Sequence, residues 1–182
     1  TKDLSGVTPS VATKIVTGLG IEDKKPFKLG EDAGQVMALK QVLRDEKGIR
    51  DPTADCLSPA GEYNMRLGVI KELKPNMVAT YTEKAGACDG HAFLVEAAVS
   101  LGGTTVREGV NIYRFANRIP LLFEPGADVV TDVAMKKINW NSYHIDQKKE
   151  HIGVYVSIVS TRIPFKGTSK EYIGADVDEI KS

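Results

Sequence analysis

The sequence predicts an α+β protein in which a small helical domain, residues 1–75, precedes a β-sheet domain, residues 76–182. Two observations lead to this prediction. Apolar residues recur at helical spacing before Pro75 and alternate with a period of two after it. The second part also gives strands and helices in the order β-β-β-α-β-α, which is typical of a sheet with helices on one face.

Three helices are expected in the first domain. Thr8-Pro9 supplies an N-cap and a proline at the first helical position for a helix that ends at Gly20. An apolar stripe with charged ends predicts a second helix from about Glu31 to Arg44. Ser58-Pro59 repeats the cap and proline pattern and opens a third helix, which stops at Lys74-Pro75.

Strands dominate the second domain, because apolar and polar residues alternate there. The first two strands are consecutive, so we expect them to pair as in a hairpin. The expected elements are strands at Met77–Thr82, Phe93–Ser100, Val110–Leu122 and Ile152–Ile158, a helix from Gly126 to about Ile138, and a final helix after Ser169.

Composition limits the class of protein. The chain has 182 residues, 42% of them hydrophobic, with 24 basic and 24 acidic side chains. It is long enough to bury a core and has no overall charge that would draw it to nucleic acid or anionic lipid. No apolar run reaches the roughly 20 residues that span a bilayer, so no contact with a membrane is expected. Cys56 and Cys88 match no zinc or disulfide spacing, and we expect both in the core of a protein from a reducing compartment.

Common catalytic motifs are absent. The chain contains no GxSxG, HExxH, P-loop or GxGxxG pattern, and its histidines, at 91, 144 and 151, lack metal-ligand spacing. We therefore expect neither a catalytic residue nor a metal site in this chain.

One candidate binding segment follows the last strand and contains two lysines, Lys166 and Lys170. The unpaired backbone N–H groups at a helix start favour anions, and a lysine beside them suits a phosphate. The alternative is that Ser169 caps the helix and both lysines are simply solvated.

A second candidate segment surrounds the only tryptophan. Aromatic rings flanked by cations can stack on bases or lie along phosphates, as in non-specific nucleic-acid contacts. The alternative is that the tryptophan ring is buried under its own loop. The residues concerned are Lys136, Lys137, Trp140, Tyr143, Lys148 and Lys149.

Two arginines, Arg114 and Arg118, lie on a largely apolar strand. Burying either without a partner would cost several kcal/mol, so each must meet a carboxylate or face water. We interpret both as structural.

The segments Arg114–Leu122 (RFANRIPLL) and Pro52–Pro59 (PTADCLSP) resemble the B subunit of topoisomerase VI, a type IIB DNA topoisomerase. The resemblance extends over essentially the whole chain. It implies a helix-two-turns-helix domain up to about residue 73, followed by a transducer domain with a ribosomal-protein-like split βαβ fold. The family's N-terminal GHKL-type ATPase domain and its long stalk helix have no counterpart here, so we expect a fragment of a longer protein.

The resemblance implies roles for particular residues. Lys170 matches the family's switch lysine, which reaches the terminal phosphate of ATP bound in the ATPase domain, and Lys166 is the alternative. The family's Trp-Lys-x-Tyr loop corresponds to Trp140-Asn141-Ser142-Tyr143, which keeps both aromatic residues but not the lysine. This loop is similar to the form in the plant and protist branch, which implies a nuclear protein rather than one in the cytoplasm or nucleoid of an archaeon.

The function implied by the resemblance is ATP-dependent passage of one DNA duplex through a double-strand break in another. ATP and Mg would be bound by parts of the complex outside this chain, which alone would be inactive. The implied partners are the A subunit, a second B subunit in an A2B2 assembly, and double-stranded DNA. Two alternatives remain: a nucleic-acid-binding adaptor without a link to ATP, and a scaffold of the meiotic break machinery.

Overall fold

The computed structural model describes residues 6–21, 31–46, 48–49, 55–88, 90–122, 125–166 and 172–174. The chain forms two compact units, one from Thr1 to Pro52 and one from Thr53 to Ser182. The sequence placed this division near residue 75. It lies earlier in the structure because the helix before Pro75 packs on the sheet.

The described part of the first unit contains two helices, α1 (Pro9–Leu19) and α3 (Ala33–Asp45), which pack together. The Thr8 hydroxyl accepts a hydrogen bond from the Val11 amide at 3.3 Å, as expected of an N-cap. Gly20 ends α1 with a φ of 61°, a left-handed conformation that glycine adopts without strain. Both helices agree with the expectation from the sequence.

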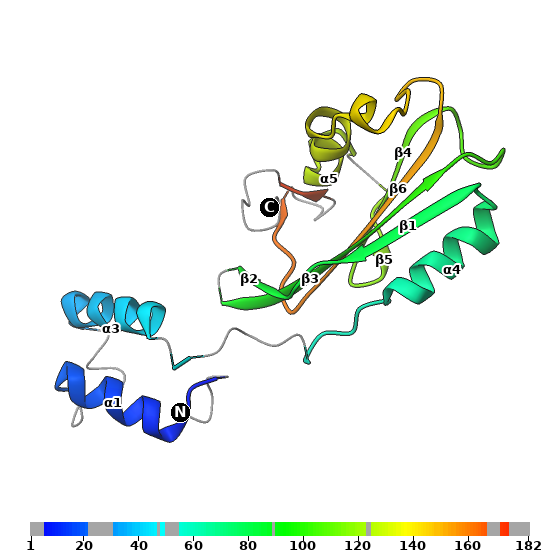
Figure 1. Cartoon of the computed structure of the whole chain (residues 1–182). Helices are drawn as coiled ribbons and strands as arrows, with labels where there is room; N and C mark the ends of the chain where they lie inside the picture. Colours follow the sequence, from blue (N-terminus) through cyan, green and yellow to red (C-terminus); the bar gives the residue numbers. More distant parts are fainter. Residues whose placement is uncertain are drawn as a thin grey trace. The chain divides into compact units, whose positions relative to one another are not determined.

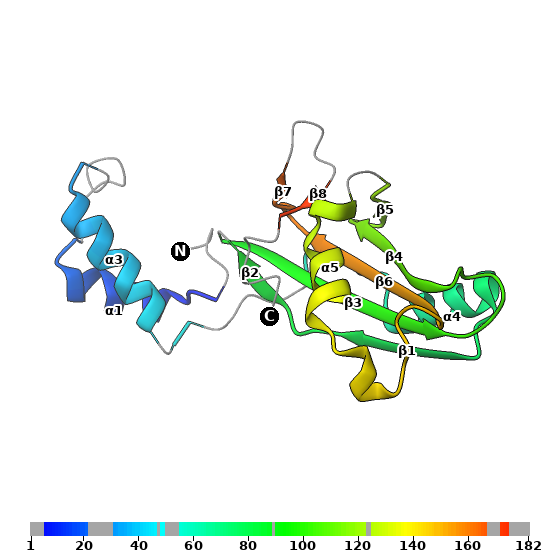
Figure 2. The same ribbon diagram turned by 90° about the horizontal axis from the view of Figure 1, so that it is seen from above.

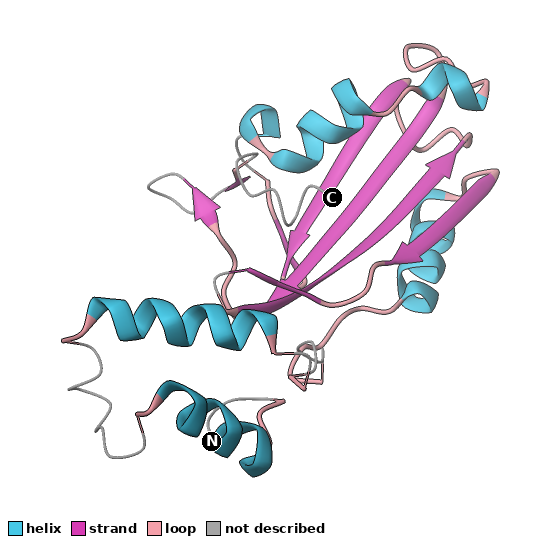
Figure 3. Cartoon of the chain, turned by 60° about the vertical axis from the view of Figure 1, so that its left-hand side comes forward, coloured by secondary structure: helices cyan, strands magenta, loops and turns pink. Residues whose placement is uncertain are grey.

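The second unit is built on a mixed six-stranded sheet. Its strands are drawn in magenta in Figure 3. The strand order is β1-β3-β6-β4-β5, and β2 pairs with β3. Neighbouring strands are antiparallel except for β4 and β6, which run parallel. The predicted α+β class is confirmed. The strands are β1 (Met77–Thr82), β2 (Gly86–Cys88), β3 (His91–Leu101), β4 (Gly109–Ala116), β5 (Ile119–Pro120) and β6 (His151–Ser160).

The strand expected from Val110 to Leu122 is in fact a hairpin of β4 and β5. Asn117 and Arg118 form its turn, with φ values of 48° and 69°. Two consecutive left-handed residues are typical of tight hairpin turns. The Asn117 side chain donates to the Ser160 carbonyl at 3.1 Å and accepts from the Ser160 amide at 3.0 Å, which fixes the turn to the end of β6.

Helices cover both faces of the sheet, not one face as expected (Figures 1 and 2). On one face, Val69 of α4 (Glu62–Leu73) packs on Ala98 and Tyr155. On the other face, Val129 packs on Ile158. The elements of that face are η1 (Pro125–Ala127), α5 (Val129–Asp132), the π-helical η2 (Val133–Lys137) and η3 (Trp140–Tyr143), so the helix expected from Gly126 to Ile138 exists as three successive turns of different type.

Helix α4 starts at Glu62 rather than at the Ser58-Pro59 pair. The reason is a tertiary contact: the fully buried carboxylate of Glu96, on β3, accepts the backbone N–H groups of Ala60 (2.9 Å) and Gly61 (2.5 Å). These two amides are thereby held outside the helix. A buried carboxylate needs such donors, and here they come from the chain that enters α4.

The expectation that both cysteines are in the core was wrong for Cys56, which is exposed, whereas Cys88 is half-buried. Within the described part of the chain, no helix is long and apolar enough to cross a membrane.

Gly153 on β6 provides a test of the packing between the sheet and α4. A Cβ atom at this position would collide with the hydroxyl groups of Tyr155 and Ser100, which lie 3.2 Å apart and are buried. We expect Gly153→Ala to lower the free energy of unfolding by about 1–3 kcal/mol, measured by urea denaturation. Gly68 in α4 is the matched control, because a Cβ there meets nothing within 4 Å. Gly68→Ala should stabilise the protein by up to about 1 kcal/mol, and equal losses in the two variants would contradict the packing described.

Candidate functional site

A buried ion pair connects β4 to the start of α5. Arg114 Nη1 lies 3.0 Å from Asp128 Oδ2, and the two side chains are 4% and 1% exposed. Asp128 is also the N-cap of α5, since its Oδ1 accepts from the Val130 amide at 2.9 Å. Arg114 Nη2 donates to the Leu121 carbonyl at 3.2 Å. Of the two outcomes expected for Arg114, a carboxylate partner or exposure to water, the structure shows the carboxylate.

The same carboxylate holds a small hairpin that follows the sheet. Strand β7 (Phe165–Lys166) pairs with β8 (Tyr172–Ile173), beside α5 in Figure 2. Asp128 Oδ2 accepts from the Ile173 amide at 3.0 Å, and Ile173 itself is buried against Val129. Asp128 therefore joins β4, α5 and the β7–β8 hairpin at one point.

Of the two lysines of the first candidate segment, the structure describes only Lys166. Lys166 is on β7 and is exposed. Lys170 follows it in the connection between β7 and β8 and lies outside the described residues. The helix expected after Ser169 is wrong at Tyr172 and Ile173, which form strand β8. The reason is tertiary: the Ile173 amide donates to the Asp128 carboxylate, and the Ile173 side chain packs on Val129.

Trp140 of the second candidate segment is a core residue, only 5% exposed. Its indole N–H donates to the Ala134 carbonyl at 2.8 Å, and its ring packs with Ile152 and Val154 of β6. This geometry agrees with the alternative in which the ring is buried under its loop. Stacking on a base would require the core to open.

The remaining residues of the second segment are exposed, Tyr143 to 69%. The side chain of Gln147 donates to the Met135 carbonyl at 3.4 Å, so the two lysine pairs of the segment lie on neighbouring turns. Lys136 binds Asp132 at 2.9 Å, and Lys149 is 3.9 Å from Asp146. Acidic neighbours thus offset part of the positive charge. The pairs are Lys136 with Lys137 and Lys148 with Lys149.

Trp140 is the only tryptophan of the chain, so its fluorescence reports on this loop alone. Because the indole is buried and hydrogen-bonded, we expect blue-shifted emission, weak quenching by acrylamide, and no change when duplex DNA is added. Trp140→Ala should cost about 3–5 kcal/mol of stability. Emission that shifts on addition of DNA while the protein stays folded would restore the stacking hypothesis.

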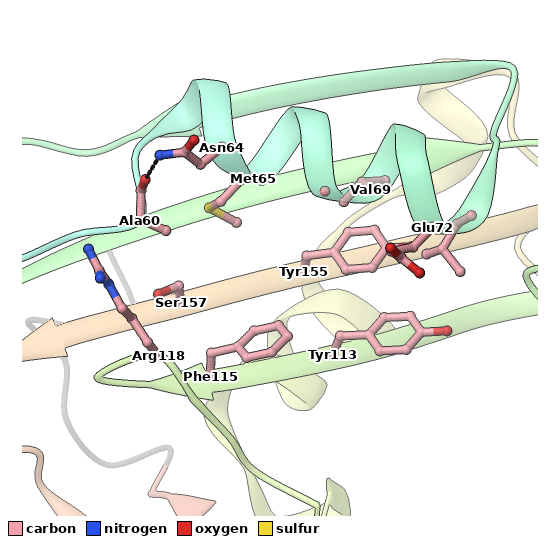
Figure 4. A pocket seen from close by; sticks show the side chains of 12 residues that line it. Ala60, Asn64, Met65, Val69, Glu72, Tyr113, Phe115, Arg118, Tyr155 and Ser157 are labelled. Atoms are coloured by element: carbon pink, nitrogen blue, oxygen red, sulfur yellow. Dashed lines mark hydrogen bonds between the residues drawn. The ribbon is translucent and has the colours of Figure 1, made fainter.

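A pocket of about 530 Å³ between α4 and strands β4 and β6 was not anticipated from the sequence (Figure 4). The rings of Tyr113 and Tyr155 stack in its floor, with centroids 4.8 Å apart and planes 8° apart. Burial raises the pKa of Tyr155. Arg118 lies at one end of the pocket and Glu72 at the other. The period-two spacing of Tyr113 and Phe115 was the available signal, but sequence alone did not reveal that α4 covers this face.

Arg118 is exposed, unlike Arg114, and hydrogen-bonds to the loop before α4. It donates to the Pro59 carbonyl at 2.8 Å and to the Ser58 hydroxyl at 3.1 Å. Both arginines therefore have structural partners, as expected.

Among the residues with described positions, no three His, Cys, Asp or Glu side chains are grouped so that they could hold a metal ion. Two of the histidines make polar contacts within the chain. His91 meets the Thr161 hydroxyl at 3.0 Å, and His151 contacts the Val106 carbonyl.

Comparisons with known proteins agree with this fold. A family model described as "Topoisomerase VI B subunit, transducer" matches residues 52–182. The chain is 61% identical over 163 residues to the B subunit of DNA topoisomerase 6 from Arabidopsis thaliana, covering 84% of this chain and 24% of the relative. The protein of the same name from Oryza sativa subsp. indica is 59% identical over 148 residues, 81% of this chain and 21% of the relative.

An archaeal relative is more distant. The B subunit of type 2 DNA topoisomerase 6 from Saccharolobus islandicus is 34% identical over 181 residues, 98% of this chain and 33% of the relative. The chain thus spans between a fifth and a third of the length of these relatives. The matched family segment begins at residue 52, next to the boundary at which the second compact unit begins.

Proposed function

Because this chain belongs to the topoisomerase VI B-subunit family, we propose that it is the part of that protein that relays ATP binding and hydrolysis to the DNA-cleaving A subunit. One observation supports this role most directly. The connection that carries Lys170 joins the two strands of a hairpin that is fastened to the buried Asp128. A lysine that senses a nucleotide in another domain needs such a rigid base.

In this proposal the Lys170 ammonium contacts the terminal phosphate of ATP in one orientation of the two domains only. A ligand shifts an equilibrium between orientations only through contacts that differ between them. ATP and Mg²⁺ would be held by parts of the complex outside residues 1–182, and hydrolysis would remove the group that Lys170 contacts. The transducer would then be free to change its orientation.

The same proposal includes an A2B2 assembly in which two B subunits close around one duplex while the A subunits cleave another. DNA contacts by this chain would come from Tyr143 and the four lysines near it, without Trp140. The higher identity to plant than to archaeal relatives supports a nuclear location. A nucleic-acid-binding adaptor or a scaffold of the meiotic break machinery would leave Lys170 without a role.

The proposal is tested by purifying the full-length protein with its A subunit and measuring relaxation of supercoiled plasmid. We expect relaxation with ATP, none without nucleotide, and changes of linking number in steps of two, since each event passes one duplex through another. Relaxation that is independent of ATP, or DNA binding without any relaxation, would favour the adaptor.

A further inference from the structure

We propose that Asp128, held by Arg114, is a positioning residue that fixes the hairpin from which Lys170 acts. This inference rests on the proposed function. It assigns a role in coupling to a buried ion pair that otherwise looks purely structural. It depends on the contacts of Asp128, Arg114 and Ile173, all of which the structure describes.

The hairpin cannot hold its own position. Strands β7 and β8 pair through two residues each, Phe165 with Ile173 and Lys166 with Tyr172. Isolated two-stranded hairpins are marginally stable at best, even when they are longer than this one. The hairpin must therefore be fixed by what it contacts.

Its fixed point is the Asp128 carboxylate. One oxygen accepts the Val130 amide at 2.9 Å, and the other accepts the Ile173 amide at 3.0 Å while facing Arg114. Asp128 also forms a β-bridge with Gly174, just beyond β8. Apolar contacts of Ile173 with Val129 seat the strand beside the carboxylate. The hydrogen bond of Ile173 and one of its apolar contacts thus both involve the start of α5, and Ile158 of β6 belongs to the same apolar cluster.

Chain length connects this fixed point to Lys170. Three residue steps separate Lys170 from Ile173, and three steps span at most about 11 Å even when fully extended. The place where Ile173 is held therefore limits how far away Lys170 can lie. A displacement of about 1 Å at a reacting group can change a rate by about a hundredfold.

Both acceptor oxygens of Asp128 are needed, not only its shape. An asparagine has one acceptor oxygen and an NH₂ group that only donates, so it cannot accept from both amides and also satisfy the Arg114 guanidinium. Asp128→Asn would therefore release Ile173 or Val130 while it changes the side-chain volume very little.

The test compares Asp128→Asn with Glu96→Gln in the full-length B subunit assembled with its A subunit. Glu96 is the matched control: it is another buried carboxylate that accepts two backbone N–H groups, but it faces α4 on the opposite side of the sheet. We measure the melting temperature, kcat and KM for ATP, and the number of relaxation events per ATP hydrolysed.

We expect Asp128→Asn to lower relaxation per ATP by about tenfold, with KM for ATP within about twofold of wild type. Glu96→Gln should lower the melting temperature at least as much and leave relaxation per ATP within about twofold. Amide hydrogen exchange at Ile173 should accelerate in the first variant and not in the second. This split would support a positioning role.

Equal losses of coupling in both variants would show a merely structural role and overturn the inference, as would normal coupling in Asp128→Asn. If that variant does not fold, Ile173→Pro removes the donor to Asp128 and keeps the Arg114–Asp128 pair, with the same expectation. Lys170→Ala distinguishes failure of the proposed function from failure of the positioning role of Asp128. Normal coupling in Lys170→Ala would refute the proposed function itself, whereas impaired coupling in Lys170→Ala with normal coupling in Asp128→Asn refutes only the positioning role.

Discussion

Replacing Lys170 by alanine in the complete enzyme is expected to lower ATP-driven relaxation of supercoiled DNA by about ten- to a hundredfold. The reason is that a charge-assisted contact to a phosphate contributes roughly 1.5–3 kcal/mol, and about 1.4 kcal/mol corresponds to a factor of ten in an equilibrium. If this contact exists in only one orientation of the transducer, its loss removes most of the preference for that orientation. The measurement is the initial rate of relaxation at saturating ATP.

Lys166→Ala is the matched control, because Lys166 belongs to the same hairpin, is exposed, and lies four residues earlier. It should relax DNA at close to the wild-type rate. The same loss in both variants would point to a general effect of positive charge on DNA binding. A Lys166→Ala variant that fails while Lys170→Ala works would transfer the sensing role to Lys166.

Arg114→Ala is expected to have the largest effect on stability. The substitution leaves the Asp128 carboxylate, only 1% exposed, without its cationic partner. Breaking a buried ion pair from one side costs about 3–5 kcal/mol, a large part of the total stability of a domain of this size. Urea denaturation of the 182-residue chain, followed by far-UV circular dichroism, measures the loss.

The control for this prediction is an ion pair on the same helical segment. Lys136 lies 2.9 Å from Asp132, but the two side chains are 75% and 26% exposed. Lys136→Ala should therefore change the free energy of unfolding by less than about 1 kcal/mol. A loss of less than about 1 kcal/mol in Arg114→Ala would mean that water reaches Asp128 and that the pair is not a buried anchor.

Local signals were sufficient to predict much of the fold. Helix α1 begins after its N-cap Thr8 and ends at its C-cap Gly20, as the sequence predicts, because capping depends on residues close in sequence. The long alternation of residue types in β3 and β6 is a local signature of strands, and both strands were located to within a few residues. The elements that failed depend on partners far away in the chain.

Helix α4 shows this dependence most clearly. The cap and proline pattern at Ser58-Pro59 is a valid local signal for a helix start. The helix nevertheless starts later, because Glu96, more than thirty residues further along the chain, accepts hydrogen bonds from the Ala60 and Gly61 amides. The turn at Asn117 and Arg118 lacks the glycine that usually marks two left-handed residues, and its bonds to Ser160 compensate. Neither contact leaves a trace in the sequence nearby.

The candidate site was predictable in part. Arg114 on an apolar strand predicted either a carboxylate partner or exposure to water, and the pairing with Asp128 depended on the packing of α5 against β4. Trp140 with flanking lysines is compatible with either a core residue or a DNA contact, and only the burial of the ring distinguishes them. The physical signal, a lysine beside an expected helix start, applied to Lys166 and Lys170 alike, and only the resemblance to a family put Lys170 first.

The central place of β6 in the sheet also has a consequence for biosynthesis. Strand β6 joins β3 to β4, yet it leaves the ribosome last of the three. At a synthesis rate of about 5–20 residues per second, the edge of β3 that pairs with β6 stays unpaired for several seconds. Unpaired strand edges can pair with other chains and so promote aggregation. Protection of the nascent chain by a chaperone until residue 160 has emerged would therefore raise the yield of folded protein.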